Sequence, residues 1–281
     1  MTAGRVDGKV AYITGAARGQ GRSHAVRLAE EGADIIAIDL CGTVDTVSYP
    51  LGTAEDLAET ARLVEAQGRR IVTAQADVRD FDAVKATLES GAEELGGLDI
   101  VVANAGIATY AAGHEIEDQA WNDMLDIDLK GVWHAIKAAV PRLVAQGSGS
   151  IVIASSASGL IGPPNLAHYV AAKHGALGLM KSFANELGPH SIRVNSVCPT
   201  QVDTPMIMHD EIYRMFRPDL ENPGKDDIVD VSTKMNLIPV PWVEDRDVSN
   251  AVLWLASDEA RYVSGAAIPV DAGIVTKVLL G

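Results

Sequence analysis

The sequence predicts an α/β protein in which helices cover both faces of a doubly wound parallel sheet, a three-layer arrangement of helix, sheet and helix. Two observations predict this fold. Short β-branched runs that are apolar throughout alternate with longer segments of helical period. Strands buried on both faces of a parallel sheet need such runs, and the strand–helix alternation is typical of βαβ crossovers. No internal repeat or low-complexity linker divides the chain, so we expect a single domain over residues 1–281.

The expected elements follow one another along the chain. The expected strands span residues 10–14, 34–39, 71–74, 99–103, 150–154 and 191–197. Two expected helices span residues 19–31 and 54–67, and three more begin near Phe81, Gln119 and Leu166. Two segments interrupt this pattern, and we call them the insertion (about 41–53) and the lid (about 204–241, rich in Met, Pro and charge). Loops of this length in a compact α/β domain are usually lids or binding loops.

Composition excludes several classes of function. Hydrophobic residues make up 47% of the chain and charged residues 22%, which is typical of a globular protein rather than a disordered one. The formal charge of −15 argues against nucleic acids and anionic membranes as partners, because both attract clustered Lys and Arg. No apolar run reaches the roughly 18 residues of a membrane span, and the first residues lack the apolar stretch of a signal peptide. We therefore expect a cytoplasmic protein.

Neither a disulfide framework nor a metal site is expected. The two cysteines, Cys41 and Cys198, form no CxxC motif. The seven histidines show no spacing typical of metal ligands, and ordinary surface or core positions explain them better.

A glycine-rich turn follows the first expected strand, where residues 14–21 read Thr-Gly-Ala-Ala-Arg-Gly-Gln-Gly. Glycines at such a turn let the backbone approach a pyrophosphate, which then sits over the amides at the start of the next helix. The spacing is GxxxGxG rather than the general GxGxxG, so the glycines alone leave an ordinary strand–helix turn open. Their place between a buried strand and an amphipathic helix favours a dinucleotide site.

Acidic and amide side chains follow at the same carboxyl edge of the sheet. Asp39 ends the second strand, 20 positions after Gly19, where a carboxylate can accept hydrogen bonds from the adenosine ribose. The same charge repels a 2′-phosphate, so NAD is predicted rather than NADP. The alternative is a solvated acid at the end of a strand. Asp77 and the turn Asn104-Ala105-Gly106 either line the cofactor cleft or merely close turns.

Tyr169 and Lys173 are four positions apart and share one helix face. A free tyrosine has a pKa of about 10, which is too high for efficient proton transfer at neutral pH, and a nearby ammonium lowers it. Ser156 follows the strand at 150–154, and its hydroxyl could donate to a substrate carbonyl. Each signal is weak alone, because Tyr–Lys pairs at this spacing occur by chance and Ser155, Ser156 and Ser158 could be turn residues.

Taken in order, TGxxxGxG, Asn-Ala-Gly, Ser and YxxxK resemble the short-chain dehydrogenase/reductase family over nearly the whole chain. The resemblance implies a Rossmann-type domain with strand order 3-2-1-4-5-6-7 and a homotetramer. It implies that Tyr169 is the acid/base and that Lys173 tunes it while binding the nicotinamide ribose. It also implies that Ser156, 13 positions before Tyr169, orients the substrate oxygen.

The same resemblance implies a set of residues that contact NAD. They are Gly15, Arg18, Gly19, Gln20, Gly21, Asp39, Leu40, Asp77, Val78, Asn104, Ala105, Gly106, Tyr169, Lys173, Pro199, Val202 and Thr204.

Asp128 departs from the family pattern, which commonly has Asn before Leu-x-Gly in the fourth helix. The resemblance implies that this residue acts through its backbone carbonyl on a relay water, a role that Asp can fill, so Asp128 is placed with the catalytic residues. Its side chain, however, lacks the amide donor and adds negative charge near Lys173.

Other residues resemble a narrower branch of the family, the mycofactocin-coupled, carveol-dehydrogenase-like enzymes. They are Gly-Arg-Ser-His at 21–24, Ile-Asp-Leu-Cys at 38–41, Pro-Thr at 199–200, Thr-Pro-Met at 204–206 and Pro-Val-Pro-Trp-Val at 239–243. The 38 positions from Asp39 to Asp77 also make the insertion longer than usual for the family. This resemblance implies an NAD held so tightly that it does not exchange, with mycofactocin, a peptide-derived redox partner, as electron acceptor.

We therefore predict an NAD-dependent oxidoreductase that acts on a small hydrophobic secondary alcohol or ketone, because the methionines of the lid can adapt to irregular apolar ligands. Two alternatives stay open. One is a conventional NAD-dependent carbonyl reductase with an exchangeable cofactor. The other is a non-catalytic dinucleotide-binding sensor that kept the fold.

Overall fold

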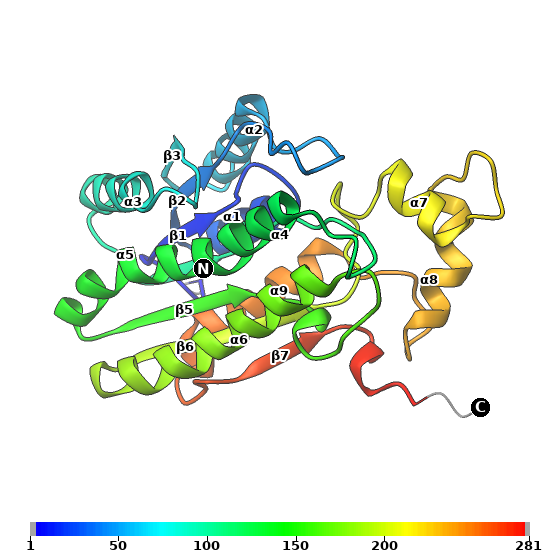
Figure 1. Ribbon diagram of the computed structural model, residues 1–281. Coiled ribbons are helices and arrows are strands. Elements are labelled where there is room, and N and C mark those ends of the chain that lie inside the picture. The colour runs from blue at the N-terminus through cyan, green and yellow to red at the C-terminus, as the bar shows by residue number, and fades with distance from the viewer. Residues whose placement is uncertain (1–3, 279–281) are drawn as a thin grey trace.

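Seven parallel strands form one sheet in the computed structural model of the chain, which describes residues 4–278 (Figure 1). The strands are β1 (Val10–Thr14), β2 (Asp34–Asp39), β3 (Ile71–Gln75), β4 (Ile100–Ala103), β5 (Gly149–Ala154), β6 (Ile192–Pro199) and β7 (Ala267–Val270). Their order is β3-β2-β1-β4-β5-β6-β7, and every neighbouring pair is parallel. The predicted fold class and strand order are confirmed.

Helices cover both faces of this sheet. They are α1 (Gly19–Glu30), α2 (Ala54–Glu65), α3 (Phe81–Leu95), α4 (Asp118–Leu125), α5 (Gly131–Gln146), α6 (Ala167–Leu187), α7 (Asp210–Phe216), α8 (Val229–Met235) and α9 (Asp245–Ala256). Helices α1, α2 and α9 pack on one face, and α3, α5 and α6 pack on the other. A turn of π-helix, Asp126–Lys130, joins α4 to α5.

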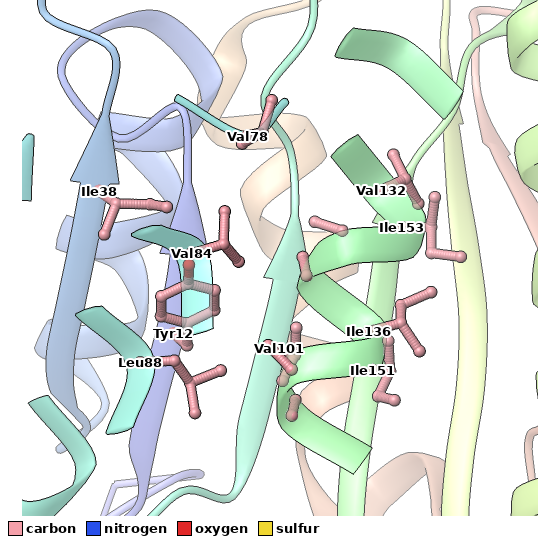
Figure 2. Close-up of a cluster of buried hydrophobic side chains, with 14 of the residues drawn as sticks. Tyr12, Ile38, Val78, Val84, Leu88, Val101, Val132, Ile136, Ile151 and Ile153 are labelled. Atoms are coloured by element: carbon pink, nitrogen blue, oxygen red, sulfur yellow. The ribbon is translucent and has the colours of Figure 1, made fainter. Parts of the chain in front are cut away.

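The side chains of β1 show how the two cores arise. Tyr12 points to the core formed with α3 and α5, while its neighbours Ala11 and Ile13 point to the core formed with α1, α2 and α9. Figure 2 shows Tyr12 beside Val84 and Leu88 of α3. Because successive strand residues face opposite sides, a strand covered on both faces must be apolar at every position.

The expected strands are all present, with ends that differ by at most two residues. The resemblance implied a seventh strand, but no residue range was predicted for it. That strand, β7, has only four residues and contains Pro269. Proline cannot donate to a strand ladder and is tolerated at the edge of a sheet, which is where β7 lies.

The two interrupting segments differ from each other. The insertion contains no helix or strand among the described residues and begins with Cys41 in the left-handed region, at φ 47°. The lid is not the loop that the sequence predicted, because α7 and α8 form within it. Within residues 4–278, no helix is both long and apolar enough to cross a bilayer.

Candidate active site

A cleft opens at the carboxyl ends of β1, β2 and β4. Strand β1 lies where the sheet order changes direction, and ligands of open α/β sheets bind at this topological switch point. Most of the predicted cofactor residues line the cleft: Gly15, Arg18, Gly19, Gln20, Gly21, Asp39, Leu40, Asp77, Val78, Asn104, Ala105, Gly106 and Thr204. These residues come from separate strand ends, so the fold brings together what the sequence spreads over about 190 positions.

The glycine turn needs its glycines for space and for backbone conformation. Gly15 and Gly19 have φ of +67° and +51°, a region that favours glycine. A Cβ on Gly21 would lie 2.0 Å from the carbonyl oxygen of Gly15. Among the described residues no side chain caps α1, so its first amides are left for a ligand. Backbone amides at a helix N-terminus behind a close-packed glycine turn fit the pyrophosphate of a dinucleotide.

Asp39 is held in place rather than left in solvent. One carboxylate oxygen accepts a hydrogen bond from the amide of Ala17 at 2.9 Å, and the other accepts one from the amide of Cys41 at 3.1 Å. The carboxylate therefore has a fixed position on the wall of the cleft. This position fits the predicted contact with the adenosine ribose.

Asp77 and Asn104 both close turns and line the cleft. Each residue therefore combines the two roles that the sequence offered as alternatives. The Asn104 amide donates to the carbonyls of Thr14 and Gly15, at 3.0 and 3.2 Å, and thereby ties β4 to the glycine turn. Asp77 pairs with Arg79 at 2.7 Å. Burial tends to raise the pKa of Asp77, but the hydrogen bonds from Arg79 hold it below its usual value.

Four predicted cofactor residues do not line this cleft: Tyr169 and Lys173, which are described below, and Pro199 and Val202. Pro199 is the last residue of β6 and is buried. Val202 is 3% exposed and forms an isolated parallel bridge with Val243. They help to place the start of the lid, whose Thr204 does line the cleft.

Lys173, on α6, has a buried ammonium beside the predicted acid/base. Its Nζ lies 5.3 Å from the centre of the Tyr169 ring. The same Nζ donates to the carbonyl of Ala154 at 3.2 Å and lies 3.0 Å from a carboxylate oxygen of Asp128. The structure thus brings together three residues of the predicted catalytic set, Tyr169, Lys173 and Asp128.

The contacts of Ser156 distinguish it from the serines beside it. The hydroxyl of Ser155 is buried and donates to the carbonyl of Lys173 at 3.1 Å, which gives it a structural role. Ser156 precedes a short 3-10 turn, and its hydroxyl oxygen accepts the amide of Ser158 at 3.1 Å. Burial raises the pKa of Tyr169, and the Ser156 side chain is among the groups that oppose this rise, whereas Ser155 is not.

The electrostatics of the site are set by burial and by one charge pair. Burial raises the pKa of Tyr169, Lys173 opposes this rise, and Asp128 adds to it. Burial alone would lower the pKa of Lys173, but Asp128 and Tyr169 raise it, so the ammonium keeps its proton. Burial raises the pKa of Asp128, against the influence of Lys173 and of the Ile107 amide.

Sequence reasoning missed Tyr49 of the insertion. This side chain is 4% exposed and lines the cleft. Its hydroxyl oxygen accepts the amide of Ala108 at 3.0 Å, and its ring lies 4.9 Å from the ring of His209 in the lid. Beside it, the Ser48 hydroxyl donates to the carboxylate of Glu211. We call these four residues, Ser48, Tyr49, His209 and Glu211, the insertion–lid contact.

Among residues 4–278 no group of three or more His, Cys, Asp or Glu side chains could hold a metal ion. The features of the site are instead a glycine turn before a helix, a fixed carboxylate at the end of β2, and a buried Tyr–Lys pair. Together they define a dinucleotide-dependent oxidoreductase.

The family model described as "short chain dehydrogenase" matches residues 9–212, more than half of the chain. The chain therefore belongs to the short-chain dehydrogenase/reductase family. This confirms the predicted family and enzyme class.

Relatives that are similar along their full length support the same assignment. A (−)-trans-carveol dehydrogenase from Rhodococcus erythropolis is 56% identical, over 97% of this chain and 99% of that protein. Among solved structures, a carveol dehydrogenase from Mycobacterium avium in complex with NAD is 62% identical, with TM-score 0.96 over 98% of this chain and all of that one. A short chain dehydrogenase from Mycobacterium paratuberculosis bound to NAD is 45% identical, with TM-score 0.89 and the same coverage. Both bound structures agree with the predicted cofactor.

Proposed function

We propose that this chain is an NAD-dependent alcohol dehydrogenase that interconverts a small hydrophobic secondary alcohol and its ketone. The observation that carries the proposal is the buried Lys173 ammonium, which lies beside the Tyr169 ring and next to Gly106 of the cleft lining. The two NAD-bound relatives and the fixed carboxylate of Asp39 support NAD as the cofactor.

In the oxidation direction the chain's own residues handle the hydroxyl proton. Tyr169, as phenolate, accepts the proton of the alcohol, and the Ser156 hydroxyl holds the oxygen in place. Lys173 stabilises the phenolate, because an opposite charge favours the ionised form. NAD, when bound, supplies the acceptor for the hydride that leaves the carbinol carbon. In the reverse direction Tyr169 returns its proton to the ketone oxygen.

The apolar character of the substrate is supported by the lid and by the relatives. Pro205 and Met206 line the cleft beside Thr204, and methionine adapts to irregular apolar shapes. Two relatives at 56% and 62% identity act, by their names, on carveol. The direct test mixes the purified protein, as it carries its cofactor, with (−)-trans-carveol and follows the absorbance of NADH. No reduction with carveol or with a panel of other secondary alcohols would favour the non-catalytic sensor.

A finer part of the proposal is that NAD stays bound through turnover and that mycofactocin takes up the electrons. Support comes from the insertion–lid contact, in which Ser48 bonds to Glu211 and the ring of Tyr49, a residue of the cleft lining, lies against the ring of His209. Mass spectrometry of the dialysed protein should find NAD or NADH still bound. Ready loss on a desalting column, with ordinary turnover on added NAD, would favour the conventional carbonyl reductase. The cytoplasmic location and the homotetramer expected from the sequence stay predictions.

A further inference from the structure

The carboxylate of Asp128 is fully buried and has two partners. One oxygen accepts the amide of Ile107 at 2.9 Å, and the other lies 3.0 Å from Nζ of Lys173. The side chain of Asp128 is 0% exposed and that of Lys173 is 5% exposed. Burying a carboxylate costs free energy unless a cation pairs with it, and at this position Lys173 is the cation that pairs with Asp128.

The backbone around the pair leaves room for it. Asp128 is in the middle of the π-helical turn, Asp126–Lys130, a type of turn that is frequent at functional sites. On the opposite side, a Cβ added to Gly106 would lie 2.8 Å from the Asp128 carboxylate and 3.3 Å from the Lys173 ammonium. The glycine therefore allows the carboxylate and the ammonium to meet at this point.

The groups that face Tyr169 come from several elements. Lys173 on α6, Asp128 in the π-helical turn, Ser156 after β5 and Cys198 in β6 all influence the pKa of Tyr169, and Tyr169 in turn influences the pKa of Tyr49 and of Tyr110. Within this set the positive charge of Lys173 favours the phenolate of Tyr169, and the carboxylate of Asp128 disfavours it. Because Asp128 sits on the ammonium itself, the two charges largely cancel at the tyrosine.

We propose that Asp128 is a positioning residue that fixes Lys173 and compensates its charge, so that Tyr169 keeps its proton at neutral pH. Alcohol oxidation then accelerates as the solution becomes alkaline, while the protonated tyrosine is ready to donate to a ketone. This inference rests on the proposed role of Tyr169 as the acid/base.

The test compares Asp128→Asn with a matched control, Asp126→Asn. Asp126 lies on the same turn, but its side chain is 46% exposed and pairs with Lys130. The probe is (−)-trans-carveol, and the reading is the rate of the first turnover, followed as NADH absorbance across pH. We expect a wild-type midpoint above neutral pH, an Asp128→Asn midpoint lower by about one pH unit or more, and an unchanged midpoint in Asp126→Asn. The asparagine can still accept the Ile107 amide, so the turn keeps that bond.

Two results would overturn the inference: an Asp128→Asn midpoint equal to that of wild type, or a rate that falls equally at every pH. A second measurement does not depend on the folding of Asp128→Asn. The ultraviolet difference spectrum between wild type and Tyr169→Phe reports the tyrosinate of Tyr169, and complete ionisation at neutral pH would overturn the inference too. Failure of the proposed function looks different, because Tyr169→Phe would then retain turnover with carveol.

Discussion

The two sides of the cleft are built by different kinds of contact. The wall consists of strand ends and the glycine turn, with helix α6 next to it at Gly106. Side chains bound to the main chain hold the wall together, because the Asn104 side-chain amide donates to two carbonyls and the Asp39 carboxylate accepts from two amides. The cover is the insertion–lid contact, where side chains meet across segments without a shared sheet or helix. The fold thus places the site residues, and we propose that a few side chains of the cover control how long the cofactor stays bound.

Tyr169→Phe should have the largest effect, and it should slow the reaction without weakening the binding of NAD. Removing the hydroxyl removes the proton acceptor, and general acid–base groups contribute about 10²–10⁴-fold to rate. We expect a loss of that size in NADH formation with (−)-trans-carveol, and NAD still bound by mass spectrometry. A variant that loses NAD together with activity would show that Tyr169 is part of the binding wall more than of the chemistry.

Gly21→Ala should damage the wall itself. The new Cβ would lie 2.0 Å from a main-chain oxygen, that of Gly15, so the turn must shift. Such overpacking destabilises a fold by about 1–3 kcal/mol, and we expect NAD affinity to fall by roughly two orders of magnitude because the amides lose their alignment. Calorimetry of NAD binding and thermal unfolding measure the two effects.

Gly178→Ala is the matched control for that change, because nothing lies within 4 Å of the added Cβ on α6. It should leave NAD binding unchanged and raise stability by about 0.5–1 kcal/mol, the usual gain in a helix interior. Equal NAD affinities in the two variants would refute the role given to the glycine turn.

Asp39→Asn should change the choice of cofactor more than the strength of binding. The substitution keeps the size of the side chain and removes the charge that repels a 2′-phosphate. We expect the preference for NAD over NADP to fall about tenfold or more, which corresponds to removal of about 1.4 kcal/mol of repulsion. The readout is the ratio of the two dissociation constants on cofactor-free protein, and a wild-type preference for NADP would contradict the argument.

The sequence predicts the wall well because local pattern determines it. Strand β1 has the predicted bounds, Val10–Thr14. A short apolar run between turn residues is typical of a buried strand in an α/β fold. The spacing of Tyr169 and Lys173 likewise puts both on one helix face. The cover could not be predicted in this way. Tyr49 and His209 are 160 positions apart and belong to segments without periodicity, so nothing local indicates that their rings meet.

Ser48→Ala should have the smallest effect, and it isolates the cover. The lost hydrogen bond to Glu211 is exposed, and such bonds contribute about 1 kcal/mol or less, so NAD should leave roughly two- to fivefold faster. The measurement is the rate at which labelled NAD is displaced by unlabelled NAD. The first turnover with carveol should not change, because no wall residue is altered.

Ser182→Ala provides the matched control for the cover. Ser182 also donates to a glutamate, Glu186, at 2.9 Å, but on exposed positions of α6 outside the cleft lining. Its NAD release should equal that of wild type. Ser48→Ala could also release NAD at the wild-type rate while Tyr49→Phe releases it faster. In that case Tyr49 and its hydrogen bond with the Ala108 amide, rather than Ser48, slow the release of the cofactor. If neither variant changes release, the wall alone retains the cofactor, and the division between wall and cover is wrong.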